Sequence, residues 1–107
     1  MMITQQQINL LRDVIVETMQ PKKIYLFGSY ANGTANQNSD VDLLIEIDHS
    51  DLPKRKRTAE IYKKISNSRF LDTDILVRTT YEIEYFKSIK NSFLSTIIRE
   101  AKIVYAQ

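Results

Sequence analysis

The sequence predicts an α+β fold, in which a small mixed β-sheet carries helices packed mainly on one face. Its 107 residues and 43% hydrophobic content are ordinary for one globular domain. Short apolar runs alternate along the chain with segments of helical periodicity, and turn-forming residues separate them. No repeat, linker or low-complexity segment interrupts this order. We therefore expect a single domain over residues 1–107.

The first half of the chain indicates one helix and two strands. Thr4 and Gln7 have the spacing of a capping box, and apolar residues then recur at helical spacing until Pro21: Ile8, Leu11, Ile15 and Met19. Residues 24–27 form a short apolar and aromatic run that ends at a glycine, which is typical of a buried strand. Residues 41–47 largely alternate apolar and acidic side chains, which predicts a second strand.

The second half predicts another helix, a third strand and a helical C-terminal region. Residues 54 to about 66 form a charged amphipathic segment whose apolar content is Ala59, Ile61, Tyr62 and Ile65. Residues 70–77 are predicted to be a strand, and residues 81–100 one or two helices broken near Asn91 and Ser92. Residues 103–105 are candidates for a last short strand.

Composition excludes several classes of site. The chain has no cysteine, which excludes disulfides, thiolate metal sites and thiol nucleophiles, and fits a reducing compartment. The N-terminal residues lack the apolar core of a signal peptide, and no apolar run is long enough to span a bilayer. We therefore expect a cytoplasmic protein that does not bind membranes.

The positive charge gives little support for nucleic-acid binding. A formal net charge of +2 is too small to argue for it, so the case depends on one cluster, residues 54–57 with Lys63, Lys64 and Arg69. Only Tyr62 in that stretch offers a stacking platform. The cluster is typical of a solvated helix face, and contact with a partner protein or a triphosphate is the other interpretation. We do not expect direct nucleic-acid binding.

The most informative motif is a glycine-serine turn just before a pair of strand carboxylates. Gly28 and Ser29 follow the first predicted strand, Gly33 closes the turn region, and Asp40 and Asp42 lie two residues apart. Glycines bring backbone N–H groups close to an anion, and carboxylates at i and i+2 of a strand point to the same face. This layout predicts a site for a metal and a phosphate.

A third carboxylate would complete the site if the predicted strands pair side by side. Asp74 lies at the start of the apolar run of the third strand, and Asp72 is a secondary candidate on the same side. Carboxylate oxygens suit Mg²⁺ or Mn²⁺ better than zinc. Such a cluster fits in-line phosphoryl displacement, with Asp74 accepting the proton of an attacking hydroxyl and the Gly28-Ser29 turn holding the triphosphate.

At these residues the chain resembles the minimal nucleotidyltransferases, the smallest members of the DNA polymerase beta superfamily. The matching elements are Gly28-Ser29, ten residues, then Asp40-Val41-Asp42, and the later Asp74-Ile75-Leu76-Val77. The resemblance extends over nearly the whole chain, including its C-terminal segment at residues 98–105. It implies the polymerase beta-like fold, with Asp40, Asp42 and Asp74 as metal ligands and Gly28 and Ser29 as phosphate-binding residues. Asn32 departs from the pattern, because many relatives carry a basic residue there.

The resemblance also implies a reaction and a partner. Members of this group are often encoded beside a helical HEPN protein, typically an RNase toxin, and silence it by transferring AMP from ATP to one of its tyrosines. The expectation is therefore a protein adenylyltransferase with ATP as substrate, acting as the antitoxin of a hetero-oligomeric pair. Two alternatives stay open: an antitoxin that acts only by binding, and transfer to a small molecule such as an aminoglycoside.

Overall fold

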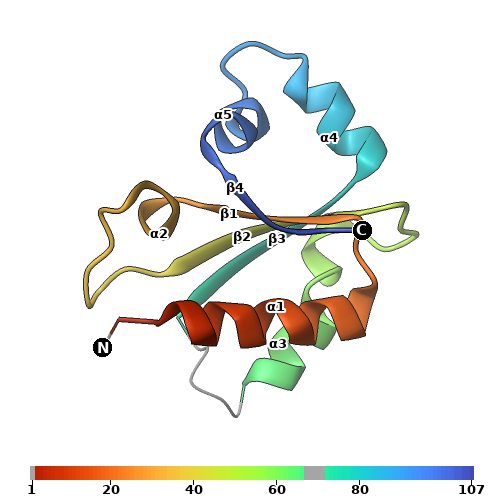
Figure 1. Ribbon diagram of the computed structural model, residues 1–107. Helices are drawn as coiled ribbons and strands as arrows, with labels where there is room; N and C mark the ends of the chain where they lie inside the picture. The colour runs from red at the N-terminus through yellow and green to blue at the C-terminus, as the bar shows by residue number, and fades with distance from the viewer. Residues whose placement is uncertain (1, 67–71) are drawn as a thin grey trace.

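Four strands form one mixed sheet in the computed structural model, which describes residues 2–66 and 72–107. The strand order is β3-β2-β1-β4, and β2 and β3 are parallel, whereas β1 is antiparallel to both β2 and β4 (Figure 1). The strands are β1 (Lys23–Phe27), β2 (Val41–Ile47), β3 (Thr73–Thr79) and β4 (Lys102–Ala106). The α+β class and the mixed sheet are confirmed.

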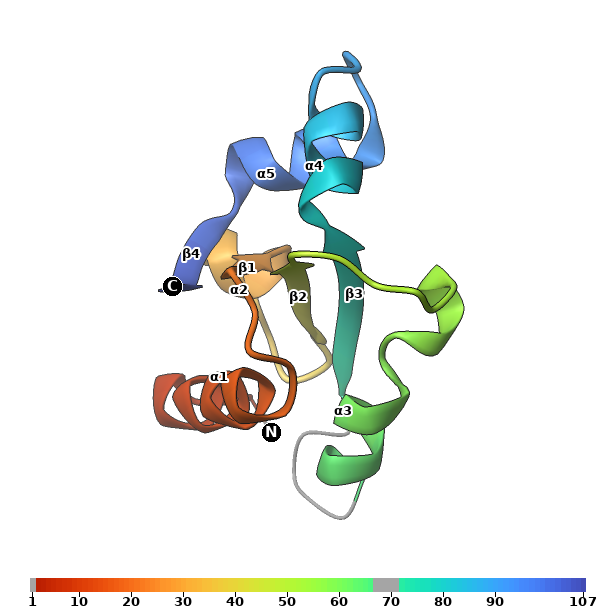
Figure 2. The same cartoon turned by 90° about the vertical axis from the view of Figure 1, so that its right-hand side faces the viewer.

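The helices cover both faces of this sheet, not mainly one. On one face lie α1 (Gln5–Met19) and α3 (Ala59–Ile65), and on the other lie α4 (Thr80–Lys87) and α5 (Phe93–Glu100), as Figures 1 and 2 show. The short α2 (Ser29–Asn32) directly follows β1. No helix in the described part of the chain combines the length and the apolar composition needed to cross a membrane.

The central strand explains why both faces are covered. In β2, Leu43 and Ile45 belong to the larger core under α1 and α3, whereas Leu44 belongs to a second core with Ile83 and Ile97 of the other two helices. Leu44 is fully buried, so its face of the sheet also needs a cover. On this face of β2, Leu44 is the only aliphatic residue and stands between Asp42 and Glu46. The sequence pattern therefore did not predict that this face is buried.

The first helix begins and ends as its sequence predicts. The Thr4 side chain accepts a hydrogen bond from the backbone of Gln7, and the Gln7 side chain accepts one from the backbone of Thr4, which completes the capping box. Gln20 takes a left-handed conformation with φ 50° and ends the helix before Pro21. The buried face consists of Ile8, Leu11 and Ile15.

The segment at residues 54–66 is divided where one long helix was expected. A 3₁₀ turn, η1 (Lys54–Lys56), precedes α3, and Arg57 lies between them. The hydroxyl of Tyr62 in α3 donates to the carbonyl of Thr73 at 3.2 Å and accepts from the N–H of Ile75 at 2.9 Å. Residues 70 and 71 of the expected third strand lie outside the described residues, and β3 runs on to Thr79.

The C-terminal region forms two helices and a strand. A break separates α4 from α5, as predicted, and Ser92 caps the second helix by accepting a hydrogen bond from the N–H of Ser95 at 3.1 Å. The last strand, β4, confirms the prediction for residues 103–105 and pairs with β1.

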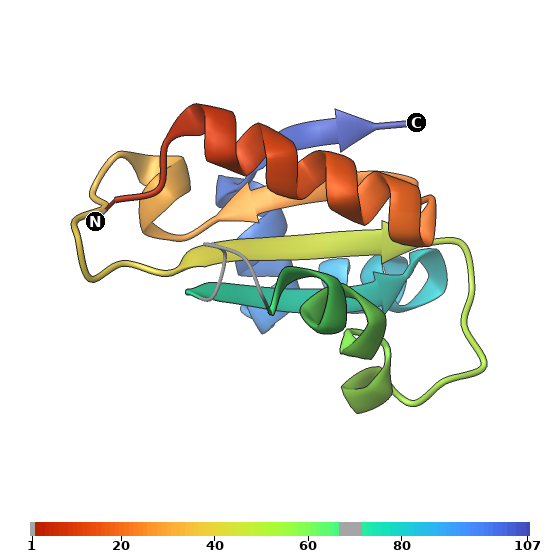
Figure 3. The same ribbon diagram turned by 90° about the horizontal axis from the view of Figure 1, so that it is seen from below.

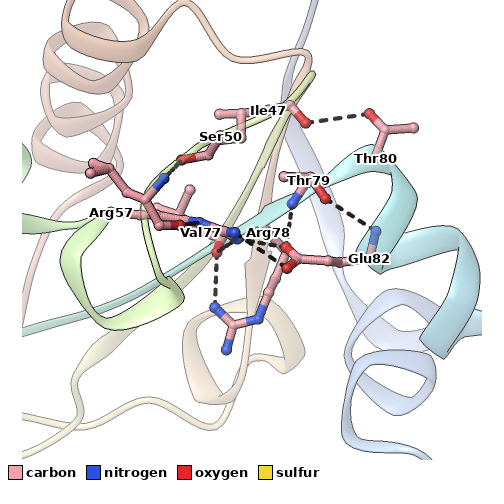
Figure 4. Close-up of polar contacts among 9 residues, drawn as sticks. Ile47, Ser50, Arg57, Val77, Arg78, Thr79, Thr80 and Glu82 are labelled. Atoms are coloured by element: carbon pink, nitrogen blue, oxygen red, sulfur yellow. Dashed lines mark hydrogen bonds and ion pairs between the residues drawn. The ribbon is translucent and has the colours of Figure 1, made fainter.

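Arg57 links the connection after β2 to the helix α4 through an ion pair and hydrogen bonds (Figure 4). Its Nη1 lies 2.6 Å from Oε1 of Glu82, and the two side chains are 7% and 18% exposed. The same guanidinium donates to the carbonyls of Leu52 and Val77 at 3.0 and 3.4 Å. Glu82 also accepts from the N–H of Thr79 at 2.8 Å, so one carboxylate serves both the ion pair and the cap of α4.

We expect Glu82→Gln to lower the free energy of unfolding by about 3 kcal/mol at pH 7, because it leaves the Arg57 charge buried and unpaired. Burial alone would raise the pKa of Glu82, but hydrogen bonds from Arg57 and Thr79 and the charges of Arg57 and Lys54 lower it to about 2. The stabilisation is therefore complete above the ordinary carboxyl pKa of 4.5 and is lost as the pH falls toward 2.

Urea unfolding of wild type and variant between pH 7 and pH 2 measures this difference. The matched control is Glu84→Gln, which removes an exposed pair with Lys87 and costs less than about 0.5 kcal/mol. A difference for Glu82→Gln that does not shrink with acid contradicts the assignment.

Candidate functional site

The candidate site lies at the edge of the sheet where β1 ends and β2 and β3 begin (Figure 3). Asp42, the second residue of β2, pairs in register with Phe27, the last residue of β1. On its other side Asp42 pairs with Asp74, the second residue of β3. Parallel pairing in this register sets two carboxylates side by side on one face of the sheet. The structure therefore brings together the two strand aspartates that the sequence placed in separate motifs.

Gly28 packs its backbone against the carboxylate of Asp42. Its φ is 74° and its ψ is −155°, a combination that is open almost only to glycine. A Cβ at this position would collide with Oδ2 of Asp42 and lie 3.2 Å from its Cγ. The glycine is thus required twice, by its backbone conformation and by the close approach of Asp42.

A one-turn helix carries the chain away from Gly28. The Gly28 carbonyl accepts hydrogen bonds from the N–H groups of Ala31 and Asn32 at 3.0 and 3.1 Å. The backbone N–H groups before Ala31 have no acceptor within the helix, because they belong to its first turn. Ser29 begins this helix. Gly33 ends it in a left-handed conformation with φ 82° and open space around it. Gly33 therefore serves the turn at the end of the helix opposite to Gly28.

Asn32 and Tyr30 have local roles in the same loop. The Asn32 side-chain oxygen accepts from the N–H of Thr34 at 3.1 Å, an Asx turn that uses the side chain within the loop. The Tyr30 hydroxyl accepts from the N–H of Ile3 at 2.9 Å, and its ring packs against the core under α1. Asn32, the residue that departs from the pattern that the resemblance implied, thus closes a turn in this chain.

The three aspartates act on one another electrostatically. Burial, and then the negative charges of Asp74 and Asp40, raise the pKa of Asp42. Among residues 2–66 and 72–107, no three acidic or histidine side chains form a ready-made metal cluster. Asp72 is exposed and contributes its backbone carbonyl, which accepts from the N–H of Val41 at 2.9 Å.

These residues nevertheless fit a divalent cation. Mg²⁺ usually takes one or two carboxylates and completes its shell with water and substrate phosphates, so a full protein cage is not required. Asp42 and Asp74 supply hard oxygen donors whose mutual repulsion a cation relieves. The donor set is therefore suited to Mg²⁺ or Mn²⁺ bound together with a phosphate group.

The carboxylates line a cavity of about 230 Å³, and the sequence predicted only part of its lining. Gly28, Asp42 and Asp74 were predicted. Phe93, from the start of α5, was not predicted. It is 67% exposed, and its ring contacts the Phe27 ring edge-on with 6.5 Å between centroids. Nothing near Phe93 in the sequence signals the site, because α5 reaches it only by returning over the sheet. The lining is Phe27, Gly28, Asp42, Asp74, Leu76 and Phe93.

Comparison with known proteins identifies the family. The family model described as a nucleotidyltransferase domain matches residues 8–104. This range includes the Gly28-Ser29 turn and all three aspartates. It also contains every strand except the last two residues of β4.

Curated archaeal relatives carry names that refer to adenylyl transfer. A protein of Methanocaldococcus jannaschii, provisionally named a protein adenylyltransferase, is 39% identical over 75 residues, which is 70% of each chain. A second, similarly named, is 27% identical over 83% of this chain and 81% of its own. The protein adenylyltransferase MntA of Thermococcus cleftensis is 29% identical over 78% of this chain and 73% of its own.

A solved structure has the same fold. It is described as a toxin-antitoxin with AMP-PNP, is 21% identical, and aligns with a TM-score of 0.66 over 92% of this chain and 73% of its own. Together, the family match and the 39% identical relative show that the chain belongs to the nucleotidyltransferase domain family, as the resemblance to the minimal nucleotidyltransferases implied.

Proposed function

We propose that residues 1–107 form a single nucleotidyltransferase domain that transfers AMP from ATP to a tyrosine hydroxyl of a partner protein in the cytoplasm. The observation that carries the proposal is the row of Gly28, Asp42 and Asp74 on one cavity, with the Gly28 backbone against the Asp42 carboxylate. Phosphate-binding backbone and metal-binding carboxylates must be this close for phosphoryl chemistry, because a metal held by Asp42 and Asp74 would supply positive charge to the bound phosphates.

Each residue of the row has a distinct role in the proposal. Gly28 and Ser29 bind the phosphates of ATP through the backbone and the hydroxyl, and Gly33 shapes the turn that holds them. Asp42 and Asp74 hold Mg²⁺ or Mn²⁺, with Asp40 as the third carboxylate. When bound, the metal neutralises phosphate charge and polarises the phosphorus for attack.

The reaction is an in-line displacement at the α-phosphorus. The acceptor oxygen forms a bond to phosphorus as the bond to the bridging oxygen of the β-phosphate breaks, and pyrophosphate leaves. The hydroxyl proton passes to a carboxylate, for which Asp74 is the candidate because it lies on the side of Asp42 away from Gly28. The acceptor then approaches the α-phosphorus from the side opposite to the departing pyrophosphate.

The proposed acceptor is a helical HEPN-type toxin that this chain silences as its antitoxin within a hetero-oligomer. The names of the three archaeal relatives support a protein acceptor, and the description of the structure with the same fold supports a toxin as partner. ATP as the donor is supported by the AMP-PNP in the same description.

We expect Asp40→Ala combined with Asp42→Ala to abolish AMP transfer and, with it, neutralisation of the partner. The measurement is the mass of the partner protein after incubation with ATP and Mg²⁺, together with growth of cells that express both proteins. Asp48→Ala is the matched control, because Asp48 is an exposed acid just beyond the other end of β2.

The same variants separate the alternatives. If the double variant still neutralises the partner, the chain acts by binding and the transfer mechanism is wrong. If the wild-type chain gives no AMP-sized mass increase on the partner but modifies an aminoglycoside, the acceptor is a small molecule.

Asp74→Asn tests the proposed proton acceptor. Because the amide keeps the shape of the carboxylate but binds no proton at neutral pH, we expect kcat to fall by about 10²-fold or more. The Kd for AMP-PNP without Mg²⁺, measured by calorimetry, should change far less, because the proposal places the phosphates on Gly28 and Ser29 and not on Asp74. A variant that transfers AMP at the wild-type rate removes Asp74 from this role.

Gly28→Ala tests the close approach at Asp42. The added methyl collides with the carboxylate and the backbone loses its favoured conformation, so we expect about 2 kcal/mol of destabilisation and loss of AMP-PNP binding in the protein that folds. Gly33→Ala also has a positive φ, but in the left-handed region that alanine can adopt at a cost of about 1 kcal/mol, and it meets no neighbouring atom. It should therefore be destabilised less, keep the turn and still bind AMP-PNP; equal binding by both variants would contradict the assignment.

A further inference from the structure

Two more cavities continue from the candidate site along β3. The first, of about 260 Å³, shares Phe93 with the aspartate cavity and is also lined by Lys54, Arg78, Phe86, Ser92 and Leu94. The second, of about 310 Å³, shares Lys54 and Arg78 with the first and Leu76 with the aspartate cavity. Arg55, Thr58, Ile75 and Val77 complete its lining. The three cavities adjoin one another at these shared residues along the outer strand of the sheet, and together we call them the β3 groove.

The far end of the β3 groove is positively charged. Lys54, Arg55 and Arg78 line it, and in the described part of the chain none of them forms an ion pair within 4.0 Å. The Lys54 ammonium lies 5.3 Å from the centre of the Phe86 ring, which orients the charge without neutralising it. Arg78 donates only to the backbone carbonyl of Val77, at 2.8 Å, among the hydrogen bonds described (Figure 4).

The nearby acids are already bonded. Glu82 is held by Arg57 and by the N–H of Thr79. Glu46, the register partner of Arg78 on β2, accepts from the hydroxyls of Tyr25 and Thr80 at 3.3 and 2.9 Å. The four cations Lys54, Arg55, Arg57 and Arg78 thus outnumber the two carboxylates Glu46 and Glu82, so the far end of the β3 groove keeps a net positive charge that an anion from outside can balance.

The position of the groove indicates which reactant supplies that anion. The ATP phosphates are placed at Gly28, on the β1 side of Asp42, and in-line attack brings the acceptor from the opposite side, which is β3. Arg78 is four residues beyond Asp74 on the same face of β3, about 13 Å along the strand. An extended segment of a protein spans that distance with about four residues.

We propose that the β3 groove binds the protein acceptor, and that Lys54 and Arg78 recognise an acidic side chain about four residues from the accepting tyrosine. The proposal rests on the proposed function, because it needs a hydroxyl at Asp74. A carboxylate fits the guanidinium of Arg78 and the ammonium of Lys54. A nucleic acid fits less well, since its phosphates need cations along a longer track than this short groove provides.

Peptide binding tests the recognition without depending on catalysis. The probes are two fluorescein-labelled nonapeptides with a central tyrosine, one with glutamate and one with glutamine at the fourth position on either side. Their Kd values are measured by anisotropy with AMP-PNP and Mg²⁺ present, and we expect the glutamate peptide to bind at least tenfold more tightly. Lys54→Gln with Arg78→Gln should remove this preference, and Lys54→Gln alone, an exposed change that is safe for folding, should reduce it.

The control variant is Lys63→Gln with Lys64→Gln, which removes the same charge from exposed positions of α3 on the other side of the sheet and should keep the preference. Equal binding of the two peptides by the wild-type chain overturns the proposal. It is also overturned if Lys54→Gln with Arg78→Gln weakens AMP-PNP binding but leaves the peptide preference unchanged, because the cations then bind ATP. Tighter binding of a labelled oligoadenylate than of the glutamate peptide, lost in the same variants, assigns the groove to nucleic acid and also overturns it.

The mass assay on the partner protein keeps the two proposals apart. No AMP transfer by the wild-type chain, with the peptide preference intact, refutes the proposed function alone. Transfer to the partner with no peptide preference refutes the acceptor recognition alone.

Discussion

The parallel register of β2 and β3 is the constraint on which the rest of the site depends. It sets Asp42 beside Asp74 at the edge of the sheet, and burial and the neighbouring charges raise the pKa of Asp42. Placing like charges together costs free energy, so the arrangement weakens the fold unless a cation compensates it. The pairing of β2 with β3 therefore also makes this site favourable for a positively charged ligand.

The crowding at Asp42 determines what its neighbours can be. Its carboxylate fills the space that a side chain at position 28 would need, so the residue after β1 must be glycine, and Gly28 lines the cavity. Phe93, at the start of α5, contacts Phe27 and lines the same cavity as the carboxylates. Residues from four separate parts of the chain thus form the cavity.

The parts of the site that sequence could predict are those carried by local motifs. Gly28 and the strand aspartates stand at recognisable spacings, and in the rest of the fold the capping box at Thr4 and Gln7 marks the start of α1. The second helical layer was not predictable, because Leu44 is a single apolar residue between Asp42 and Glu46 on that face. Phe93 and the division of residues 54–66 around Arg57 depend on contacts between elements that no local spacing encodes.

The ion pair of Arg57 and Glu82 connects the stability of the fold to the charge of its surface. By using the Glu82 carboxylate, Arg57 removes the acid that would otherwise pair with Lys54 or Arg78 at the far end of β3. One strand then carries carboxylate charge at its beginning, near Asp74, and positive charge at its end, near Arg78. In the proposed function the carboxylate end of β3 binds a cation and the positive end binds an anion, so a ligand with both a reactive group and an acidic group lies along β3 in one orientation. A charge gradient of this kind gives direction to the proposed acceptor.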